Sequence, residues 1–340
     1  MKITENIVAF PESWPDEYLR FAKSHPEGEA LILASSKSAD EFAPDPEALP
    51  DPTGEASCSP IPFVHRKHSG KALILLTSKC FSYCRFCFRR ATPPGGAREL
   101  SSGDLLKIRD WLLKEFDVNE VILSGGDPLT LEDDRLSEVL KLLGEPAHIK
   151  KLRVHSRAPI VKPGRINKNL IEIFCKAAKP VSMITHVVHP AEFREELWRA
   201  MELLSEGGIP LFNQTVMLKG INADPDILSL LISELHARGI ETKYIHHTDR
   251  APGNAKFRVS IREGLSIYSK LQDMVESPPE YVIDLPNGAG KFPVSSLSMR
   301  EERYTLKGLR RRYRWEGPPH KDSTSAANPP FEWWDITEQG

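Results

Sequence analysis

The chain has 340 residues, which is enough for one large α/β domain or two smaller ones. Its formal net charge of −2 predicts no general attraction to nucleic acid or to an anionic membrane. Its contents of 40% hydrophobic and 27% charged residues are ordinary for a globular protein. Five cysteines, three of them clustered, do not resemble a secreted disulfide framework. Because the first residues lack the apolar core of a signal peptide and no apolar stretch is long enough to cross a bilayer, we expect a cytoplasmic protein.

In chain order, residues 1–70 predict a few short helices and an acidic, proline-rich stretch at 39–62 that wraps or links rather than entering a core. From residue 71, short apolar runs alternate with longer amphipathic segments. The apolar runs cover 72–77, 120–123, 151–155, 180–186, 209–218 and 241–246, and the helix-like segments cover 102–115, 131–143, 167–177, 192–206, 225–238 and 261–275. This alternation predicts βαβ units and a parallel sheet, here a partial, TIM-like barrel of six βα units.

Polar residues gather where each apolar run ends. They include the cysteine loop after the first run, Ser124 to Asp127 after the second, His155 to Arg157, Thr185 and His186, Asn213 and Gln214, and His246 to Asp249. In parallel α/β barrels the chemistry takes place at the carboxyl ends of the strands. Six polar strand ends in succession therefore predict one site at one mouth.

The last part of the chain has a different composition. It contains a seventh apolar run at 281–285, a glycine-rich turn, and a Pro-, Ser- and Ala-rich tail at 318–330 followed by three aromatic residues. We expect a mobile tail, unless the aromatic residues dock on a neighbouring surface. The predicted parts are thus an N-terminal helical or irregular extension at 1–70, the barrel at 71–280, and a C-terminal segment and tail at 281–340.

Cys80, Cys84 and Cys87 are spaced C-x3-C-x2-C. An iron–sulfur cube usually takes four thiolates, so three leave one iron open to a small molecule. The spacing resembles that of radical S-adenosyl-L-methionine (radical SAM) enzymes, in which SAM binds the open iron. The alternative is three buried or zinc-binding cysteines, but zinc usually needs a fourth Cys or His in a second knuckle, and none follows at suitable spacing.

Two turns add to this pattern. Ser124-Gly125-Gly126-Asp127 follows a predicted strand, and its glycines would let the backbone approach a SAM amino group, although a plain βα turn is the alternative. The run from Asp284 to Lys291 is unlike a phosphate loop, because its first required glycine is a leucine. Lys291 could instead form a Schiff base with pyridoxal phosphate (PLP), or it could be an ordinary exposed lysine in a turn.

Six motifs occur in a fixed order along the chain. They are Cys-Arg-Phe-Cys-Phe-Arg-Arg, Ser-Gly-Gly-Asp-Pro-Leu, His-Ser-Arg-Ala-Pro-Ile-Val, Thr-His-x-x-His-Pro, Asn-Gln-Thr-Val-x-Leu-Lys-Gly and Gly-Ala-Gly-Lys. Together they resemble the lysine 2,3-aminomutase family of radical SAM, PLP-dependent enzymes, over about residues 65–293. The family relative that modifies a lysine of elongation factor P is similar over the same span. The resemblance implies a radical SAM partial barrel.

The resemblance also implies site residues. It makes Cys80, Cys84 and Cys87 the ligands of a [4Fe–4S] cluster, and it puts Gly125, Gly126, Asp127, His186 and Gln214 at the SAM site. It makes Lys291 the carrier of PLP, Arg66 a ligand of the PLP phosphate, and Arg89 the partner of the substrate carboxylate. Guanidinium pairs bidentately with carboxylate, so the last role is chemically sensible; a solvated basic run is the alternative for Arg89 and its neighbour Arg90.

By the same resemblance, Asp249 and Asp284 would bind the ε-ammonium of a lysine substrate, as two carboxylates favour a cation. Each could instead be a helix cap or a surface charge, and Arg250 could neutralise Asp249. Lys67 departs from the family, which usually has an aromatic residue there. The chain also has no cysteine after Cys175, so the family's structural zinc and the assembly it supports are not expected.

The predicted function is that of an isomerase that moves an amino group from the α- to the β-carbon of L-lysine or a related basic amino acid. A protein electron donor such as flavodoxin or ferredoxin would reduce the cluster. Two alternatives stay open: an aminomutase for a lysine of a translation factor, and a degenerate iron–sulfur paralogue. The basic run at 310–315 is interpreted as a solvated edge rather than a nucleic-acid site, and a homo-oligomer is compatible with the sequence.

Overall fold

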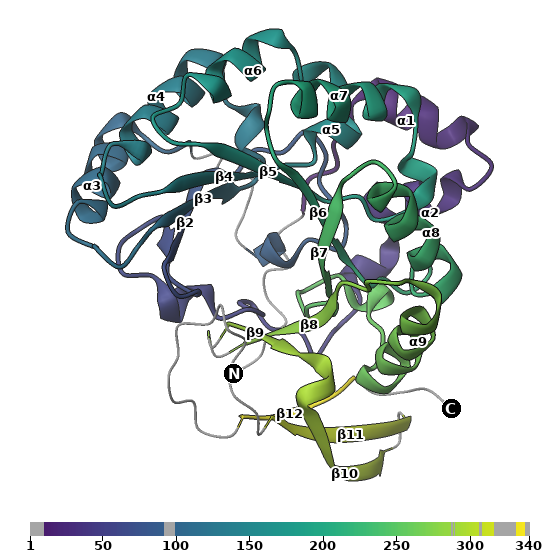
Figure 1. The fold of residues 1–340 in the computed structure, drawn as a ribbon. Coiled ribbons are helices and arrows are strands. Elements are labelled where there is room, and N and C mark those ends of the chain that lie inside the picture. Colours follow the sequence, from purple (N-terminus) through teal and green to yellow (C-terminus); the bar gives the residue numbers. More distant parts are fainter. Residues whose placement is uncertain are drawn as a thin grey trace.

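The computed structural model describes residues 10–91, 99–286, 288, 290–305, 308–315 and 331–336. Its main element is a nine-stranded sheet in the order β1 to β9, which curls into an open half-barrel (Figure 1). The strands are β1 Val64–His65, β2 Lys71–Thr77, β3 Glu120–Gly125, β4 Lys151–His155, β5 Val181–Thr185, β6 Leu211–Val216, β7 Glu241–His246, β8 Glu280–Leu285 and β9 Gly290–Pro293.

Seven of these strands, β2 to β8, pair in parallel, and β1 and β9 add antiparallel edges. Each parallel pair is joined by a crossover that contains a helix, as parallel pairing requires. The partial barrel of six βα units is confirmed, with β8 as a seventh parallel strand.

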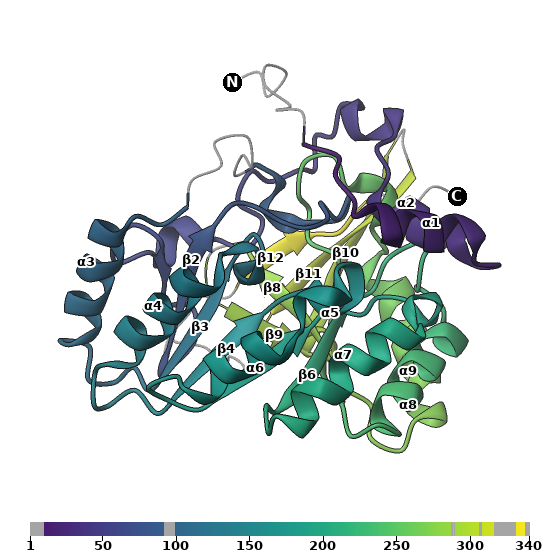
Figure 2. The same cartoon turned by 90° about the horizontal axis from the view of Figure 1, so that it is seen from above.

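Helices cover the outer face of the sheet (Figures 1 and 2). They are α3 Ser102–Leu112, α4 Asp133–Gly144, α5 Ala158–Val161, α6 Lys168–Cys175, α7 Glu195–Glu206, α8 Pro225–His236 and α9 Ile261–Met274. Four of these helices begin after a residue whose side chain accepts a hydrogen bond from a backbone N–H of the first turn; these capping residues are Ser101, Asn167, Asp224 and Ser260. Within the described part of the chain, no helix is both long and apolar enough to cross a membrane.

Burial alternates along the strands. In β6, Leu211, Asn213 and Thr215 are buried, whereas the residues between them are only half-buried. Successive side chains point to opposite faces of a sheet, so one set packs under the helices and the other lines the inner face. Because the half-barrel does not close, inner-face side chains stay partly accessible, and this accessible face is available for ligands.

The N-terminal region lies against this barrel. It contains α1 Asp16–Ser24, α2 Gly28–Ser35 and two 3-10 helices, η1 Ala39–Phe42 and η2 Glu55–Cys58. Tyr18 of α1 is fully buried and donates a hydrogen bond of 2.9 Å to Glu192, beyond β5. Irregular chain between η1, η2 and β1 leads into the barrel.

A second, three-stranded sheet follows the barrel: β10 Leu297–Thr305, β11 Gly308–Trp315 and β12 Phe331–Trp334. The sequence did not predict it. Its basic strand β11 is matched by acids, because Arg311 pairs with Glu302 at 2.6 Å and Arg312 with Glu332 at 3.0 Å. Trp333 is buried in a hydrophobic cluster that also includes Tyr281, Phe292 and Trp315. Residues 318–330 lie outside the described part of the chain.

Candidate functional site

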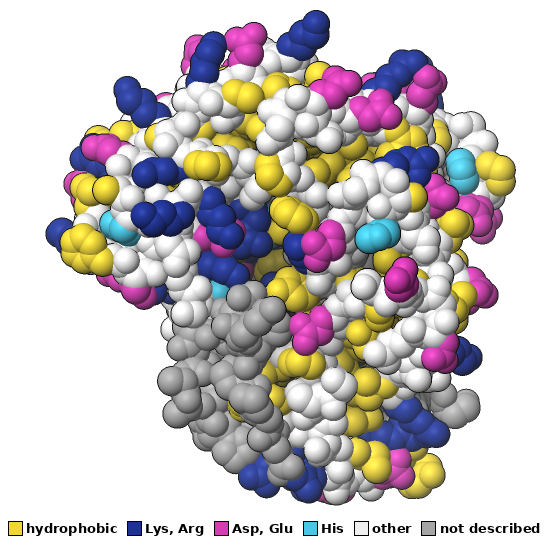
Figure 3. Space-filling model, in the orientation of Figure 1, with side chains coloured by type: hydrophobic (Ala, Val, Ile, Leu, Met, Phe, Trp, Pro, Cys, Tyr) yellow, Lys and Arg dark blue, Asp and Glu magenta, His cyan; other side chains and the backbone are white. Residues whose placement is uncertain are grey.

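The carboxyl ends of the parallel strands bring most of the predicted site residues to one mouth of the half-barrel. The inner-face positions there are His155 on β4, Gln214 on β6, His246 on β7, Asp284 on β8 and Lys291 on β9, all half-buried. In Figure 3, Lys and Arg side chains gather around the middle of the face that Figure 1 shows, with acidic and His side chains beside them. The predicted common mouth is therefore present in the structure.

The cysteine loop runs from the end of β2 to the 3-10 helix η3 Phe88–Ala91, and buried arginines hold it in place. Arg85 is fully buried; its backbone N–H donates to Ala34 at 2.7 Å, and its guanidinium pairs with Glu41 of η1. Arg90 is also buried and pairs with the same carboxylate at 2.5 Å. Neither Glu41 nor Arg85 was expected from the sequence, in which nothing local connects them.

The three cysteines lie close together in this loop, because Cys84 and Cys87 affect the thiol of Cys80 electrostatically and Cys84 affects that of Cys87. Burial raises the pKa of all three thiols, and that of Cys87 rises to about 11, with a further contribution from Cys84. A raised pKa favours the protonated thiol near neutral pH, and a bound metal would replace these protons. Among the described residues, no three His, Cys, Asp or Glu side chains converge on a point as ligands of a single metal ion would. In an iron–sulfur cube each thiolate binds a different iron, so the three thiolates need not converge on one point.

The glycines of the next turn pack against the cysteine loop itself. Gly125 has φ +118°, and a Cβ there would lie 2.4 Å from the carbonyl oxygen of Thr77. A Cβ on Gly126 would lie 2.2 Å from the carbonyl oxygen of Lys79, and the Gly126 N–H donates to Thr77 at 2.6 Å. The turn thus needs glycine to bring its backbone beside the cysteines, where a SAM bound to an open iron would lie.

Asp127 joins two strand ends. Its buried carboxylate accepts hydrogen bonds from Leu129 N at 3.0 Å, Ser156 Oγ at 2.7 Å and Arg157 N at 3.0 Å. Burial raises the pKa of this carboxyl, and the three donors oppose that rise. The carboxylate of Asp127 is therefore hydrogen-bonded within the protein, and it positions the loop after β4.

Arg157 belongs to the His-Ser-Arg-Ala-Pro-Ile-Val motif, but the sequence analysis assigned no role to this arginine. Its guanidinium pairs with buried Glu192 at 2.6 Å and lies near Cys84, whose thiol it affects electrostatically. Its Nε and Nη1 atoms are buried and have no hydrogen-bond partner within the described residues. Two such donors beside the cysteine loop fit an anionic group, such as the carboxylate of SAM.

The predicted SAM residues of the middle strands are in contact. Gln214 Nε2 lies 3.0 Å from His186 Nε2, and the rings of His186 and His155 are 5.8 Å apart. Burial, with a contribution from Arg157, lowers the pKa of His186 to about 3, so both of its ring nitrogens are never protonated together near neutral pH. A neutral imidazole suits contact with a neutral or cationic ligand.

The β8–β9 hairpin carries the lysine. Asp284 and Lys291 are direct partners in its antiparallel register, and Lys291 Nζ lies 4.9 Å from the ring centroid of Tyr244. Burial lowers the pKa of Lys291, and nearby Lys67 adds to this effect. Asp284 accepts a hydrogen bond of 2.6 Å from Lys67, and its other oxygen is 3.4 Å from His246 Nδ1.

A group such as PLP fits beside this hairpin. The Nε2 atoms of His155 and His246 are buried and lack a hydrogen-bond partner in the part of the chain that the structure describes. Buried polar atoms without partners are costly, so a ligand with polar atoms would be stabilised there. Burial and the nearby Lys291 lower the pKa of His68. His68 also lies close to Lys67 and Lys71, and these cationic surroundings suit a phosphate.

Asp249 and Arg250 point to different partners. Burial and the nearby charge of Asp284 raise the pKa of Asp249 well above its usual range. Arg250 donates to the carbonyl oxygen of Trp334 at 3.0 Å and lies over the ring of Trp333 at 4.4 Å. The concern that Arg250 neutralises Asp249 is thereby answered, because its guanidinium faces the C-terminal strand.

The two remaining predicted arginines are both paired. Arg89 donates to Glu55 of η2 from Nε at 2.9 Å and from Nη2 at 2.5 Å, and its Nη1 lies 3.2 Å from both Ser124 Oγ and Gly125 O. Arg89 is thus at the mouth beside the cysteine loop. Arg66 instead pairs with Glu115, at 2.9 Å, and Asp117, so its guanidinium faces the end of α3.

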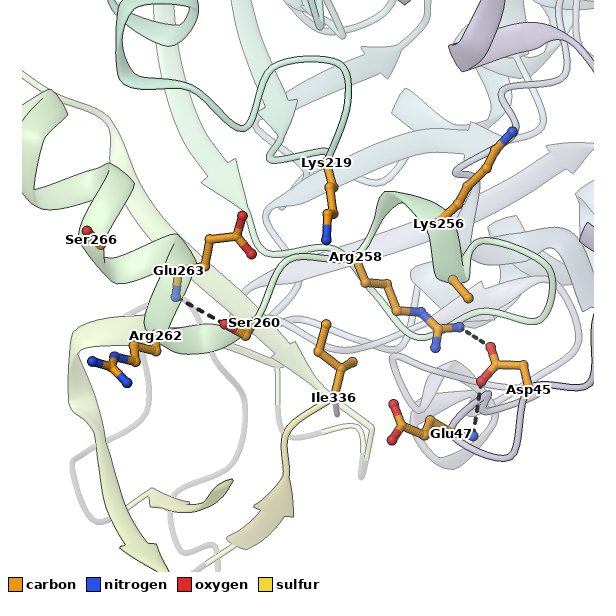
Figure 4. Close-up of a pocket in the computed structure, with 11 residues that line it drawn as sticks. Asp45, Glu47, Lys219, Lys256, Arg258, Ser260, Arg262, Glu263, Ser266 and Ile336 are labelled. Carbon is orange, nitrogen blue, oxygen red and sulfur yellow. Dashed lines mark hydrogen bonds and ion pairs between the residues drawn. The ribbon is translucent and has the colours of Figure 1, made fainter. Parts of the chain in front are cut away.

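A cavity of about 710 Å³ lies apart from this cluster, between the start of α9 and the N-terminal region (Figure 4). Its lining mixes both charges and includes Arg258, which pairs with Asp45 at 2.6 Å. None of the sequence-predicted site residues lines it. The chemistry-bearing side chains are those of the barrel mouth.

Comparison with known proteins agrees with this geometry. The model of the radical SAM superfamily matches residues 74–231. The chain is 32% identical to an L-lysine 2,3-aminomutase of Methanococcus maripaludis (86% of this chain, 68% of the relative) and 33% identical to one of Buchnera aphidicola (84% of each). A third, from Acetoanaerobium sticklandii, is 34% identical over 72% of this chain, which spans only 59% of that relative's length.

The radical SAM superfamily implies a [4Fe–4S] cluster and SAM, and the lysine 2,3-aminomutase family adds PLP. The relatives and the barrel mouth together identify an enzyme, an isomerase of the aminomutase class. The chain belongs to the lysine 2,3-aminomutase family of radical SAM enzymes.

Proposed function

We propose that this chain is a PLP-dependent aminomutase that moves the amino group of an α-amino acid from the α- to the β-carbon. One observation carries the proposal: a half-buried lysine whose pKa is lowered lies at the same mouth as three cysteines and an arginine suited to a carboxylate. Perturbed titratable groups gathered in a cleft are typical of active sites.

In this proposal, Cys80, Cys84 and Cys87 hold the cluster. The SAM site is formed by Gly125, Gly126, Asp127, His186 and Gln214, with Arg157 as a further contact. Bound there, the cluster and SAM supply radical chemistry, and PLP supplies an aldehyde for the amino group. The half-barrel keeps these groups aligned and limits the access of water.

Lys291 would react with the aldehyde of PLP. A neutral amine is the nucleophile, and burial favours the neutral form by lowering the pKa of Lys291. Its partner in the hairpin, Asp284, is ionised and opposes that shift, so the amine can be protonated again when it leaves. His68 and Lys71 lie near Lys291 and suit the phosphate, whereas Arg66 would have to leave its two acids to reach it.

Arg89 would bind the substrate carboxylate. Its Nε and Nη2 are engaged with Glu55, which holds the plane of the guanidinium, while Nη1 makes only contacts of 3.2 Å. A carboxylate at that outer edge would form charge-assisted hydrogen bonds with donors already oriented. Lysine is the substrate that the relatives' names and the two aspartates suggest, yet one aspartate is paired with Lys67.

The lysine assignment can be tested by covalent trapping. With PLP and borohydride, the wild-type chain should retain PLP after denaturation, as should Lys176→Ala, which changes an exposed lysine that pairs with Glu172 at 3.0 Å. Lys291→Ala should retain none, as read by mass spectrometry. Retention of PLP by Lys291→Ala would contradict the assignment.

The reaction itself is tested after anaerobic reconstitution with iron, sulfide, PLP, SAM and dithionite. Labelled α-amino acids should give β-amino products, detected by NMR, with the wild-type chain and not with Cys84→Ser. Cleavage of SAM without any β-amino product from a full amino-acid panel would contradict the proposed function.

A further inference from the structure

The far end of the proposed substrate pocket already contains an ammonium. Lys67 Nζ lies 2.6 Å from Asp284 Oδ1, and each side chain is only 11% exposed. Lys67 comes just after β1 and Asp284 ends β8, so the barrel's two sides are joined by this contact. A small cavity lined by Lys67, His68 and Lys71 lies beside it.

The pKa values of the two aspartates of this pocket are shifted in opposite directions. Although burial alone would raise it, Lys67 and His246 hold the pKa of Asp284 well below its usual range. Burial and the charge of Asp284 raise the pKa of Asp249, which favours the neutral form of that carboxyl. The carboxylate of Asp284 is paired with the ammonium of Lys67 at 2.6 Å, so its charge is already matched within the chain.

A cationic side chain has no unmatched carboxylate to meet there. It would enter beside Lys67, whose ammonium is held at Asp284 and repels it, and like charges in a buried site are strongly disfavoured. To bind it, the pocket would have to separate a buried ion pair or ionise Asp249. Both changes reduce affinity for lysine relative to an uncharged analogue.

Lys67 also offers donors to an uncharged side chain. An ammonium has three N–H donors, and the only hydrogen bond that Lys67 makes with the described residues is the one to Asp284. A carboxamide oxygen at this position would accept one of the remaining donors, and protonated Asp249 could donate another. An amide-bearing side chain therefore matches the pocket in charge and in hydrogen bonding.

We propose that Lys67 determines the substrate specificity of this enzyme, an inference that rests on the proposed function. The ammonium of Lys67 occupies the place at Asp284 that a substrate ammonium would take, so this enzyme takes an α-amino acid with an uncharged, hydrogen-bonding side chain. Specificity then comes from a repulsive element as well as an attractive one. The family's usual aromatic residue at this position could not supply that charge.

The test is a binding titration of the PLP-loaded enzyme without reductant, so that no turnover occurs. L-Glutamine, L-lysine and L-glutamate are added in turn, and the change in the PLP absorbance band gives each Kd. The wild-type chain should bind glutamine at least tenfold more tightly than either charged amino acid. Lys67→Met should reverse this and bind lysine at least tenfold more tightly than the wild type does.

Two further variants serve as controls. Lys67→Arg keeps the charge and should keep the preference for glutamine, and Lys107→Met, on a side chain 81% exposed, should behave as the wild type. If Lys67→Met does not fold, the order of affinities in the wild type and in Lys67→Arg still decides the matter.

Each outcome has a distinct meaning. Tighter binding of lysine or glutamate than of glutamine by the wild type overturns the specificity proposal and leaves the aminomutase reaction standing. Equal affinity of lysine for the wild type and Lys67→Met also overturns it. If no amino acid alters the band of an enzyme that has trapped PLP at Lys291, the proposed function itself fails.

Discussion

The cysteine loop and the β8–β9 hairpin both contain buried ion pairs, but the two regions use them differently. In the loop, Glu41 receives hydrogen bonds from both Arg85 and Arg90, and all three side chains are at most 5% exposed. In the hairpin, Asp284 receives one short hydrogen bond from Lys67, and Lys291 has a lowered pKa. Charges satisfied by several partners fix a structure, whereas singly bonded charges with shifted pKa values can exchange partners during a reaction.

The largest expected effect comes from breaking the loop anchor. Glu41→Gln leaves two buried guanidinium groups without their carboxylate, so we expect the free energy of unfolding to fall by about 3–5 kcal/mol. Urea unfolding followed by circular dichroism measures this. Glu172→Gln is the matched control, because its pair with Lys176 is exposed and is worth about 0.5 kcal/mol. Equal losses in the two variants would show that Glu41 does not anchor the loop.

A smaller effect is expected at Glu55, whose partner Arg89 belongs to the same loop but faces the mouth. Glu55 and Arg89 are 16% and 15% exposed, so water can replace part of the lost interaction. Glu55→Gln should therefore cost about 1–3 kcal/mol of unfolding free energy, measured in the same way. A loss as large as that of Glu41→Gln would mean that Arg89 is a structural anchor too, and the contrast between the two regions would disappear.

The third effect, the smallest for a change of one pH unit, is a pH dependence in the hairpin pocket. Because the pKa of Asp249 is raised on folding, the folded chain keeps a proton that the unfolded chain loses, and stability falls as the pH rises above the ordinary Asp value of about 3.9. Relative to wild type, Asp249→Asn should thus become more stable as the pH rises, by at most about 1.4 kcal/mol per pH unit.

Asp284 supplies the contrast of opposite sign. Its pKa is lowered on folding, so its contribution is present above the ordinary Asp pKa and is lost as the pH falls through the folded value. Relative to wild type, Asp284→Asn should therefore lose stability as the pH rises through the acid range below about 4. Unfolding curves from pH 2.5 to 7.5 measure both variants, and slopes of the same sign would refute the charge assignment of the pocket.

Much of the barrel could be predicted from the sequence because its signals are local. Apolar runs and amphipathic segments alternate, and the six predicted strands differ from the observed ones by at most two residues at an end, as in the run 209–218 against β6. The strand-end rule also put the cysteine loop and the polar ends of the other predicted strands at one mouth, whereas Lys291 was assigned a role only by the family resemblance. These inferences needed only periodicity, motif and topology.

The charge pairing could not be predicted, because its partners are far apart in the chain. Lys67 meets Asp284 across 217 residues, and Glu41 meets Arg85 across 44. Lys67 was recognisable as a departure from the family, but nothing local indicated its partner. Arg90 shows the same limit: in sequence it belongs to a basic run, yet in the structure it is buried against Glu41. The C-terminal sheet was missed because its strands are too polar to show an apolar run.

The chain between η1 and β2 has a consequence for engineering. Within 39–67 it contains Glu41, Glu55 and Lys67, whose partners are the cysteine loop and the β8–β9 hairpin. A chimaera that receives this fragment from a relative would exchange the support of the cysteine loop and the charge beside the β8–β9 hairpin in one step. The effects on stability of swapping this fragment and of swapping the barrel would therefore be strongly non-additive. Homologous recombination libraries should keep residues 39–67 together with the cysteine loop and the β8–β9 hairpin.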